Sequence, residues 1–176
     1  MDSSLRITNI VAVGQLNCPL DLTALESELD MGQYLPKRFS GLLVRVLHPF
    51  KAHCQLYKNG KITVNGARSV RAARALAQRF FIEINKIGYA CFLSDFTVVN
   101  MVASYDYGQR ISLESVVLAL REDFPQTDYC PEIFSGLTVR LPTCTAVLFH
   151  SGKINFLGAR SELDLQSALI DIQLYL

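Results

Sequence analysis

The sequence FSGLLVR at residues 39–45 returns as FSGLTVR at residues 134–140, and this repetition decides how the chain folds. Other landmarks recur around it in the same order: Asn9-Ile10-Val11 as Asn100-Met101-Val102, Gly60-Lys61-Ile62 as Gly152-Lys153-Ile154, and Gly66-Ala67-Arg68-Ser69 as Gly158-Ala159-Arg160-Ser161. In chain order the offsets are 91, 95, 92 and 92 residues. Such a period is too long for one unit of a solenoid. We therefore predict two repeats with pseudo-twofold symmetry, residues 1–92 and 93–176, that form one continuous domain and use one binding face twice.

The composition is that of a globular protein, because 50% of the 176 residues are hydrophobic and only 19% are charged. No apolar run reaches the roughly 18 residues that cross a bilayer, and the first residues lack the apolar centre of a signal peptide. We expect a soluble, intracellular protein without a membrane partner.

The cysteines and histidines show no spacing typical of a metal site. The five cysteines are odd in number and never form a C-x-x-C pair, and the three histidines are scattered. We expect reduced, mostly packing thiols, no metal ion and no cofactor. The residues concerned are Cys18, Cys54, Cys91, Cys130, Cys144, His48, His53 and His150.

The formal charge of +1 hides an asymmetry between the repeats. Residues 1–92 contain 12 Lys or Arg and 6 Asp or Glu, whereas residues 93–176 contain 5 and 10. The repeats therefore carry +6 and −5. Such a dipole can orient a protein on an asymmetric partner; drift of surface charge after duplication is the alternative interpretation.

Each repeat contains the same order of strand and helix patterns. Alternating apolar residues between Gly or Pro predict strands, and spacings of three and four predict helices. The predicted strands are 7–13, 42–47, 52–58 and 61–64, then 96–103, 137–141, 146–150 and 154–157; short helices are predicted at 20–29 and 113–120. Asn59-Gly60 and Ser151-Gly152 are typical of tight hairpins.

A longer helix closes each repeat. In the first, an apolar stripe runs from Val70 to Ile87, and Gly88 is placed to end the helix. The stripe of the second comprises Leu163, Leu165, Ala168, Leu169, Ile172 and Leu176. This order predicts an α+β fold in which helices cover one face of an antiparallel sheet and leave the other face open.

The repeated motifs, together with Pro36-Lys37-Arg38-Phe39 and Pro131-Glu132-Ile133-Phe134, resemble the core of the TATA-box-binding protein (TBP) family over about residues 5–175. The resemblance implies a TBP-like saddle, a curved antiparallel sheet of ten strands with helices on the convex face and DNA beneath the concave face. Two aromatic residues per repeat would wedge between base steps, a mechanism for which this family is itself an established example. The matching positions are Phe39 and Tyr57, then Phe134 and Phe149, and Tyr57 departs from the family's Phe.

The resemblance also implies a floor that reads the minor groove. Asn9 and Asn100 match the pair that donates hydrogen bonds to central A·T pairs. Val11 and Val102 lie beside them, and Gln55, Thr63, Asn65, Asn155 and Leu157 depart from the family's floor residues. These changes favour an altered or relaxed sequence preference, as in a TBP-related factor or a divergent TBP. Symmetric basic residues are expected to contact phosphates: Arg45, Lys61, Arg68, Arg140, Lys153 and Arg160.

Partner surfaces follow from the same resemblance. Glu132, with Tyr129, matches part of the docking site for IIB-type transcription factors, although Cys130 stands where the family usually has Glu. Arg71, Arg74 and Arg79 form either a solvated helix face or a docking surface for IIA-type factors and TBP-associated regulators. Self-association into a homodimer without DNA is expected from an exposed apolar sheet face.

No constellation of catalytic residues emerges, so we expect neither an enzyme nor a small-molecule substrate. The sequence favours a nuclear, minor-groove DNA-binding and DNA-bending general transcription initiation factor. It would nucleate the pre-initiation complex at A/T-rich core promoters and recruit a IIB-type factor. The alternative is a TBP-related interaction scaffold with weak intrinsic DNA binding that acts through partners at a specialised set of promoters.

Overall fold

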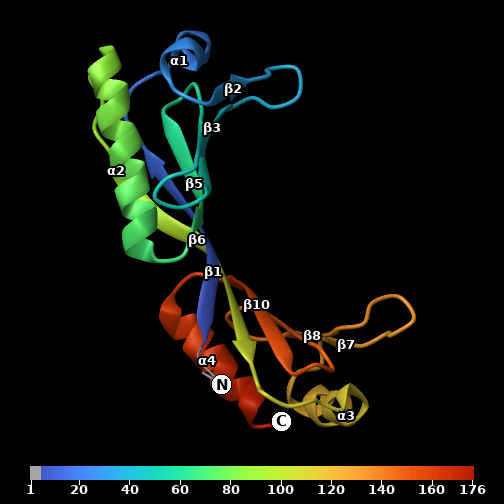
Figure 1. Cartoon of the computed structure of the whole chain (residues 1–176). Coiled ribbons are helices and arrows are strands. Elements are labelled where there is room, and N and C mark those ends of the chain that lie inside the picture. Colours follow the sequence, from blue (N-terminus) through green and yellow to red (C-terminus); the bar gives the residue numbers. More distant parts are fainter. Residues whose placement is uncertain (1–4) are drawn as a thin grey trace. The chain divides into compact units, whose positions relative to one another are not determined.

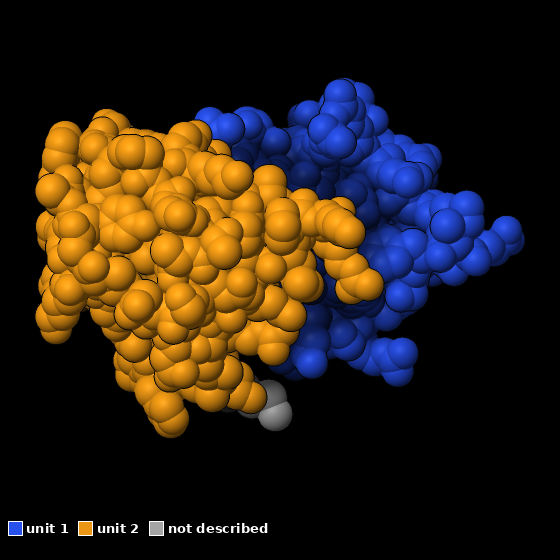
Figure 2. All heavy atoms as spheres, turned by 90° about the horizontal axis from the view of Figure 1, so that it is seen from above, with its two compact units in different colours: residues 1–8, 100–176 blue, residues 9–99 orange. Residues whose placement is uncertain are grey.

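The computed structural model describes residues 5–176, which divide into two compact units (Figure 2). The N-terminal unit, orange in Figure 2, comprises residues 9–99, and the C-terminal unit, blue, comprises the described residues 5–8 together with 100–176. Two strands, β1 (Arg6–Gln15) and β6 (Ser94–Asp106), each contribute residues to both units.

The N-terminal unit is an antiparallel sheet with strand order β2-β3-β4-β5-β1. Its other elements are α1 (Leu22–Glu28), β2 (Gly32–Tyr34), β3 (Leu42–Val46), β4 (Ala52–Leu56), β5 (Lys61–Ala67) and α2 (Val70–Ile87). The long helix α2 runs along one face of this sheet (Figure 1). Four residues of the predicted apolar stripe, Ala73, Ala77, Phe80 and Ile84, are buried together with Leu76, whereas Val70 and Ile87 at its two ends are only partly covered.

The C-terminal unit repeats this topology with strand order β6-β10-β9-β8-β7. Its elements are α3 (Leu113–Asp123), β7 (Thr127–Asp128), β8 (Leu137–Arg140), β9 (Thr145–Leu148), β10 (Lys153–Ala159) and α4 (Glu162–Gln173). The α+β fold class and the duplication are confirmed. The short strands β2 and β7 have too few residues for a recognisable alternation, and the sequence pattern did not predict them.

Capping residues fix both ends of the long helix α2. The Ser69 side chain accepts a hydrogen bond from the backbone N–H of Ala72, and Gly88 ends α2 with φ of 116°. The predicted hairpins are also confirmed, because Gly60 and Gly152 join β4 to β5 and β9 to β10 with φ of 80° and 88°.

The predicted apolar stripe of α4 is wrong at its first member. Leu165, Ala168 and Ile172 are buried, but Leu163 is 74% exposed. Ser161 is the N-cap, so Leu163 lies in the first turn, on the side of the helix away from the sheet. Leu176 lies beyond the helix, which ends at Gln173.

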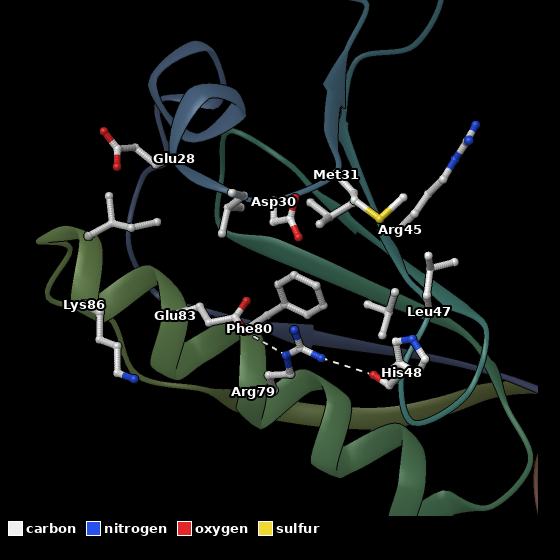
Figure 3. Close-up of a pocket in the computed structure, with 14 residues that line it drawn as sticks. Glu28, Asp30, Met31, Arg45, Leu47, His48, Arg79, Phe80, Glu83 and Lys86 are labelled. Atoms are coloured by element: carbon white, nitrogen blue, oxygen red, sulfur yellow. Dashed lines mark hydrogen bonds and ion pairs between the residues drawn. The ribbon is translucent and has the colours of Figure 1, made fainter.

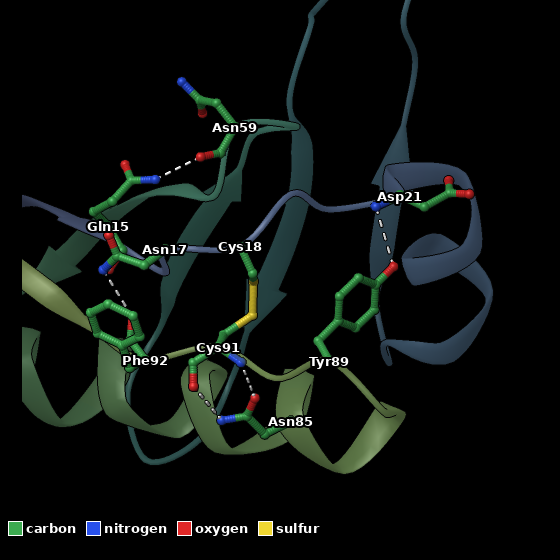
Figure 4. Close-up of a disulfide and its surroundings, with 9 residues drawn as sticks. All are labelled: Gln15, Asn17, Cys18, Asp21, Asn59, Asn85, Tyr89, Cys91 and Phe92. Atoms are coloured by element: carbon green, nitrogen blue, oxygen red, sulfur yellow. Dashed lines mark hydrogen bonds between the residues drawn. A yellow bond between two sulfur atoms is a disulfide. The ribbon is translucent and has the colours of Figure 1, made fainter.

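The expectation that all five cysteines are reduced is wrong for two of them. Cys18 and Cys91 form a disulfide in the N-terminal unit, with Cα atoms 5.3 Å apart (Figure 4). The 73 residues between them conceal a proximity that folding creates. The Asn85 side chain accepts a hydrogen bond from the Cys91 N–H (2.8 Å) and donates one to its carbonyl (3.2 Å), and Asn17 donates to the carbonyl of Phe92 (3.1 Å). These bonds hold the segment after α2 beside the end of β1.

No helix within residues 5–176 combines the length and apolar character needed to cross a bilayer. Over the same residues, no three His, Cys, Asp or Glu side chains gather as a metal ion would require.

Candidate nucleic-acid interface

Each sheet has one face packed under helices and one open face. In β5, Ile62 and Val64 are buried, whereas Thr63 and Asn65 between them are only partly covered. In the neighbouring strands, side chains likewise alternate between the two faces, and the predicted floor residues lie on the open face. We call this set of side chains in each unit its open face.

Cross-strand pairing places the open-face residues in two rows in each unit. In the N-terminal unit the rows are Arg45–His53–Asn65–Val11 and Leu43–Gln55–Thr63–Val13. In the C-terminal unit the corresponding rows are Arg140–Thr145–Leu157–Val102 and Thr138–Val147–Asn155–Ser104. The structure thus brings together the predicted floor residues of each unit.

A bulge orients the Asn9 amide. Residue Gly66 is left out of the β1–β5 pairing, between the pairs Ile10–Ala67 and Val11–Asn65, and its N–H donates to Oδ1 of Asn9 at 2.9 Å. Because that N–H requires an acceptor, the oxygen of the amide points to the sheet and the NH₂ group is left with both donors for a ligand. Gly66 has φ of 104°, a conformation that favours glycine.

The C-terminal unit repeats this arrangement. Gly158 is the residue left out of the β10–β6 pairing, with φ of 94°, and its N–H donates to Oδ1 of Asn100 at 3.0 Å. Each unit therefore presents one partly buried amide whose hydrogen-bonding polarity is fixed by the backbone. Acceptor atoms such as adenine N3 and thymine O2 in the minor groove match these donors.

The predicted wedge residues form one aromatic pair in each unit. Phe39 and Tyr57 pack edge to face with ring centroids 5.8 Å apart, and Phe134 and Phe149 do so at 6.0 Å. Phe39 is 37% exposed and Phe134 is 49% exposed, so both rings are accessible.

Glycine permits this packing. A Cβ atom at Gly41 would lie 2.7 Å from Cε1 of Phe39, and one at Gly136 would lie 2.6 Å from Cε1 of Phe134. The repeated FSGL sequence is therefore a local device that lets a Phe fold back over the start of the next strand.

The two pairs differ at one hydroxyl group. Tyr57 donates a hydrogen bond to Oε1 of Gln55, 3.2 Å away. Phe149 has no such group, and the position corresponding to Gln55 is Val147. The two departures from the family pattern in the N-terminal unit, Tyr57 in the wedge pair and Gln55 on the floor, are therefore in direct contact through this hydrogen bond.

The six predicted phosphate-binding residues are all exposed. Arg45 and Arg140 lie at the ends of the open-face rows, where they pair with His53 and Thr145. The others follow the hairpins or the last strand of each unit: Lys61, Lys153, Arg68 and Arg160.

The predicted partner residues occupy two separate places. Near the wedge pair of the C-terminal unit, the Tyr129 hydroxyl lies 3.2 Å from Glu114 Oε1 and 3.0 Å from His150 Nε2. The pKa of Glu114 is lowered, first by its backbone hydrogen bond and further by Tyr129, against the opposing effect of burial. Glu132 is exposed in the loop between Tyr129 and Phe134.

Two of the three predicted α2 arginines, Arg74 and Arg79, already have interaction partners within the protein. Arg74 lies 4.7 Å from the centre of the Phe96 ring, and Arg79 donates to Glu83 (2.7 Å) and to the carbonyl of His48 (3.3 Å). Arg79 lines a pocket of about 420 Å³ between α2, β3 and the turn after α1 (Figure 3). Arg71 is exposed.

Several open-face residues escaped the sequence analysis, among them His53, Val13, Leu43, Thr138, Thr145, Val147 and Ser104. The period-two alternation of β1, β3, β4, β6, β8 and β9 would have identified them. Sequence reasoning assigned only the positions that matched a family motif, and it did not extend the alternation to their neighbours in the sheet.

Two sets of five strands related by duplication, each with an open face and an oriented amide, define a class of duplicated α+β proteins. The family model for "Transcription factor TFIID (or TATA-binding protein, TBP)" matches residues 4–87 and 95–174. The chain belongs to the TBP family.

Individual relatives agree with this assignment. The chain is 32% identical to TATA-box-binding protein 2 of Entamoeba histolytica over 173 residues, which cover 97% of this chain and 80% of the relative. It is 32% identical to TATA box-binding protein-like 2 of Takifugu rubripes over 169 residues, 95% of this chain and about half (51%) of the relative's length. The solved structure of Methanococcus jannaschii TBP superposes with a TM-score of 0.84 at 29% identity, covering 96% of this chain and 95% of that one.

Proposed function

We propose that this protein is a transcription initiation factor that binds the minor groove of double-stranded, A/T-rich promoter DNA and bends it. The observation that carries the proposal is the pair of amides at Asn9 and Asn100, whose oxygens are fixed by Gly66 and Gly158. An A·T pair offers only acceptors in the minor groove, whereas the amino group of guanine would oppose these donors.

The aromatic wedge pairs are proposed to bend the DNA by inserting between base steps. Insertion of an aromatic ring unstacks a base step and kinks the duplex, and the exposed rings of Phe39 and Phe134 are suitably placed for this at the edge of each open face. Arg45, Arg140 and the four other basic residues would neutralise phosphates, so the affinity is expected to fall steeply with salt.

Partner binding completes the proposed role. The exposed loop with Glu132, held by the Tyr129–Glu114 contact, is the proposed surface for a IIB-type factor. The exposed face of α2, with Arg71 and Arg74, is proposed for IIA-type factors and regulators. With this role, the protein is proposed to act in the nucleus.

A gel-shift titration of the purified protein on a TATA-containing duplex and a scrambled duplex of equal length tests this function. We expect preferential binding to the TATA duplex, and a fluorescence energy-transfer signal between the duplex ends that rises on binding. Phe134→Ala should reduce both the affinity and the bend. Binding to neither duplex at low salt would instead favour the interaction scaffold, for which the polar open face of the N-terminal unit is the relevant observation.

A further inference from the structure

The open faces of the two units differ at their centres. In the N-terminal unit the residues at the centres of β4 and β5 form a block of four polar side chains, made by the cross-strand pairs His53–Asn65 and Gln55–Thr63. All four are partly covered rather than fully exposed. They therefore lie on the surface of the sheet, where a docked ligand would desolvate them.

The corresponding block in the C-terminal unit is half apolar. It consists of the pairs Thr145–Leu157 and Val147–Asn155. Leu157 is 40% exposed, although Leu is a residue that usually packs in the core. Thus Val147 and Leu157 stand where the N-terminal unit has Gln55 and Asn65.

This difference in polarity between the two open faces affects how each would accommodate the amino group of guanine. In the minor groove, G·C differs from A·T chiefly by the guanine N2 amino group, which is a hydrogen-bond donor. Against Val or Leu that donor loses water and gains no partner, which is unfavourable. Against Gln, Asn or Thr it meets an acceptor oxygen.

The acceptors of the N-terminal block are available to a ligand. Oε1 of Gln55 already accepts from Tyr57, but a carbonyl oxygen has two lone pairs and can accept a second hydrogen bond. Asn65 and Thr63 lie beside it on β5, in register with β4.

We infer that the two units read their halves of a DNA site by different rules: the N-terminal unit accepts a G·C pair where Gln55 and Asn65 face the base pair, whereas the C-terminal unit, with Val147 and Leu157 at the corresponding positions, requires A·T there. The inference rests on the proposed minor-groove function and specifies it. The preferred site would then be asymmetric, with any G·C pairs confined to one half, and this asymmetry would set the direction in which the protein binds.

The test compares G·C with inosine·C at each position of an A/T-rich duplex. Inosine lacks the amino group, so the ratio of the two affinities isolates the effect of that group. Iron–EDTA attached to Cys130, an exposed free thiol of the C-terminal unit, cleaves the DNA half that this unit contacts. Cys54 and Cys144 are buried free thiols, and burial raises the pKa of each, so the label is selective for Cys130.

We expect the amino group to weaken binding at least about tenfold at the positions that Val147 and Leu157 face in the cleaved half, and at most about twofold at the symmetry-related positions in the other half. Equal penalties in both halves, or a larger one in the half away from Cys130, would overturn the inference while leaving the proposed function intact. Failure to bind any A/T-rich duplex would overturn both.

Swaps between the units provide matched variants. Gln55→Val with Asn65→Leu introduces the residues found at 147 and 157, and it should create the roughly tenfold penalty in the N-terminal half. Val147→Gln with Leu157→Asn should remove the penalty from the C-terminal half. The second variant adds polar groups to a partly exposed face, so it tests the inference even if the first does not fold. Unchanged penalties in the folded variants would contradict the assignment to these residues.

Discussion

The hydroxyl of Tyr57 donates a hydrogen bond to Oε1 of Gln55, 3.2 Å away, and thereby holds one wedge ring to the floor of its own sheet. Insertion between base steps would break this bond and place the hydroxyl among stacked bases. We therefore predict that Tyr57→Phe tightens DNA binding by a few fold, since a neutral hydrogen bond contributes about 0.5–1.5 kcal/mol. A titration at fixed salt measures the change.

The control is the reverse change in the other unit. Phe149→Tyr adds a hydroxyl beside Val147, which offers no side-chain acceptor, and it should weaken binding. Unchanged or weakened affinity of Tyr57→Phe would show that the hydroxyl does not oppose insertion.

The Asn100 amide gives a second prediction. Asn100→Asp keeps an oxygen for the N–H of Gly158 but removes both amide donors, so the fold should be retained while DNA affinity falls at least about tenfold. Thermal unfolding and DNA titration separate the two effects.

Asn155→Asp is the matched control, because it places the same negative charge on the same open face without the bond to the backbone. A loss equal to that of Asn100→Asp would assign the effect to charge alone. A loss clearly smaller would support the role of the oriented amide.

The disulfide predicts a stability difference. Replacing Cys18 and Cys91 by Ser opens a loop closed across 73 residues, and the free energy of unfolding should fall by about 2–4 kcal/mol. Chemical denaturation with and without reductant measures this difference in the free energy of unfolding. Reductant should destabilise the original chain and leave the double Ser variant unchanged; equal midpoints for all four samples would contradict the structural role.

Asp164 predicts a pH dependence. Hydrogen bonds from the backbone N–H of Arg160 and then from Ser161 hold the pKa of its carboxyl below the ordinary value. A lowered folded-state pKa stabilises the fold above the unfolded-state pKa, near ~3.9 for Asp, and this stabilisation is lost as pH falls through the lowered value.

The variant for this test is Asp164→Asn. Its thermal midpoint should lie below that of the original chain at pH 7, and the gap should close as the pH is lowered to about 2. Glu162→Gln removes a charge from the same turn, which tests the general effect of charge at a helix N-terminus. A gap that is constant with pH would show that the ionised carboxylate is not what stabilises this turn.

Much of the fold could be predicted from the sequence because its signals are local. The Asn59-Gly60 and Ser151-Gly152 turns and the stop at Gly88 all act within a few residues. The disulfide could not be predicted, since the proximity of Cys18 and Cys91 depends on the packing of α2 against the sheet. Leu163 was misplaced because a three-and-four spacing does not show where a helix begins.

The candidate site was only partly predictable. Repetition singled out Asn9 and Asn100, but the bond from a bulged glycine that orients each amide depends on the register of β1 with β5 and of β6 with β10. The polar block around Gln55 depends likewise on which residues of β4 and β5 face each other. Register of this kind is a property of the folded sheet, and a linear pattern of residues does not display it.

The most direct test of the central claim is a titration of the purified protein on a TATA duplex and on the same duplex with every A·T pair replaced by inosine·C. The replacement preserves the arrangement of minor-groove acceptors and changes the major groove. If the open faces read the minor groove as proposed, the two affinities should agree within about threefold. Loss of binding on the inosine duplex, with tight binding to the TATA duplex, would show that recognition takes place elsewhere on the DNA.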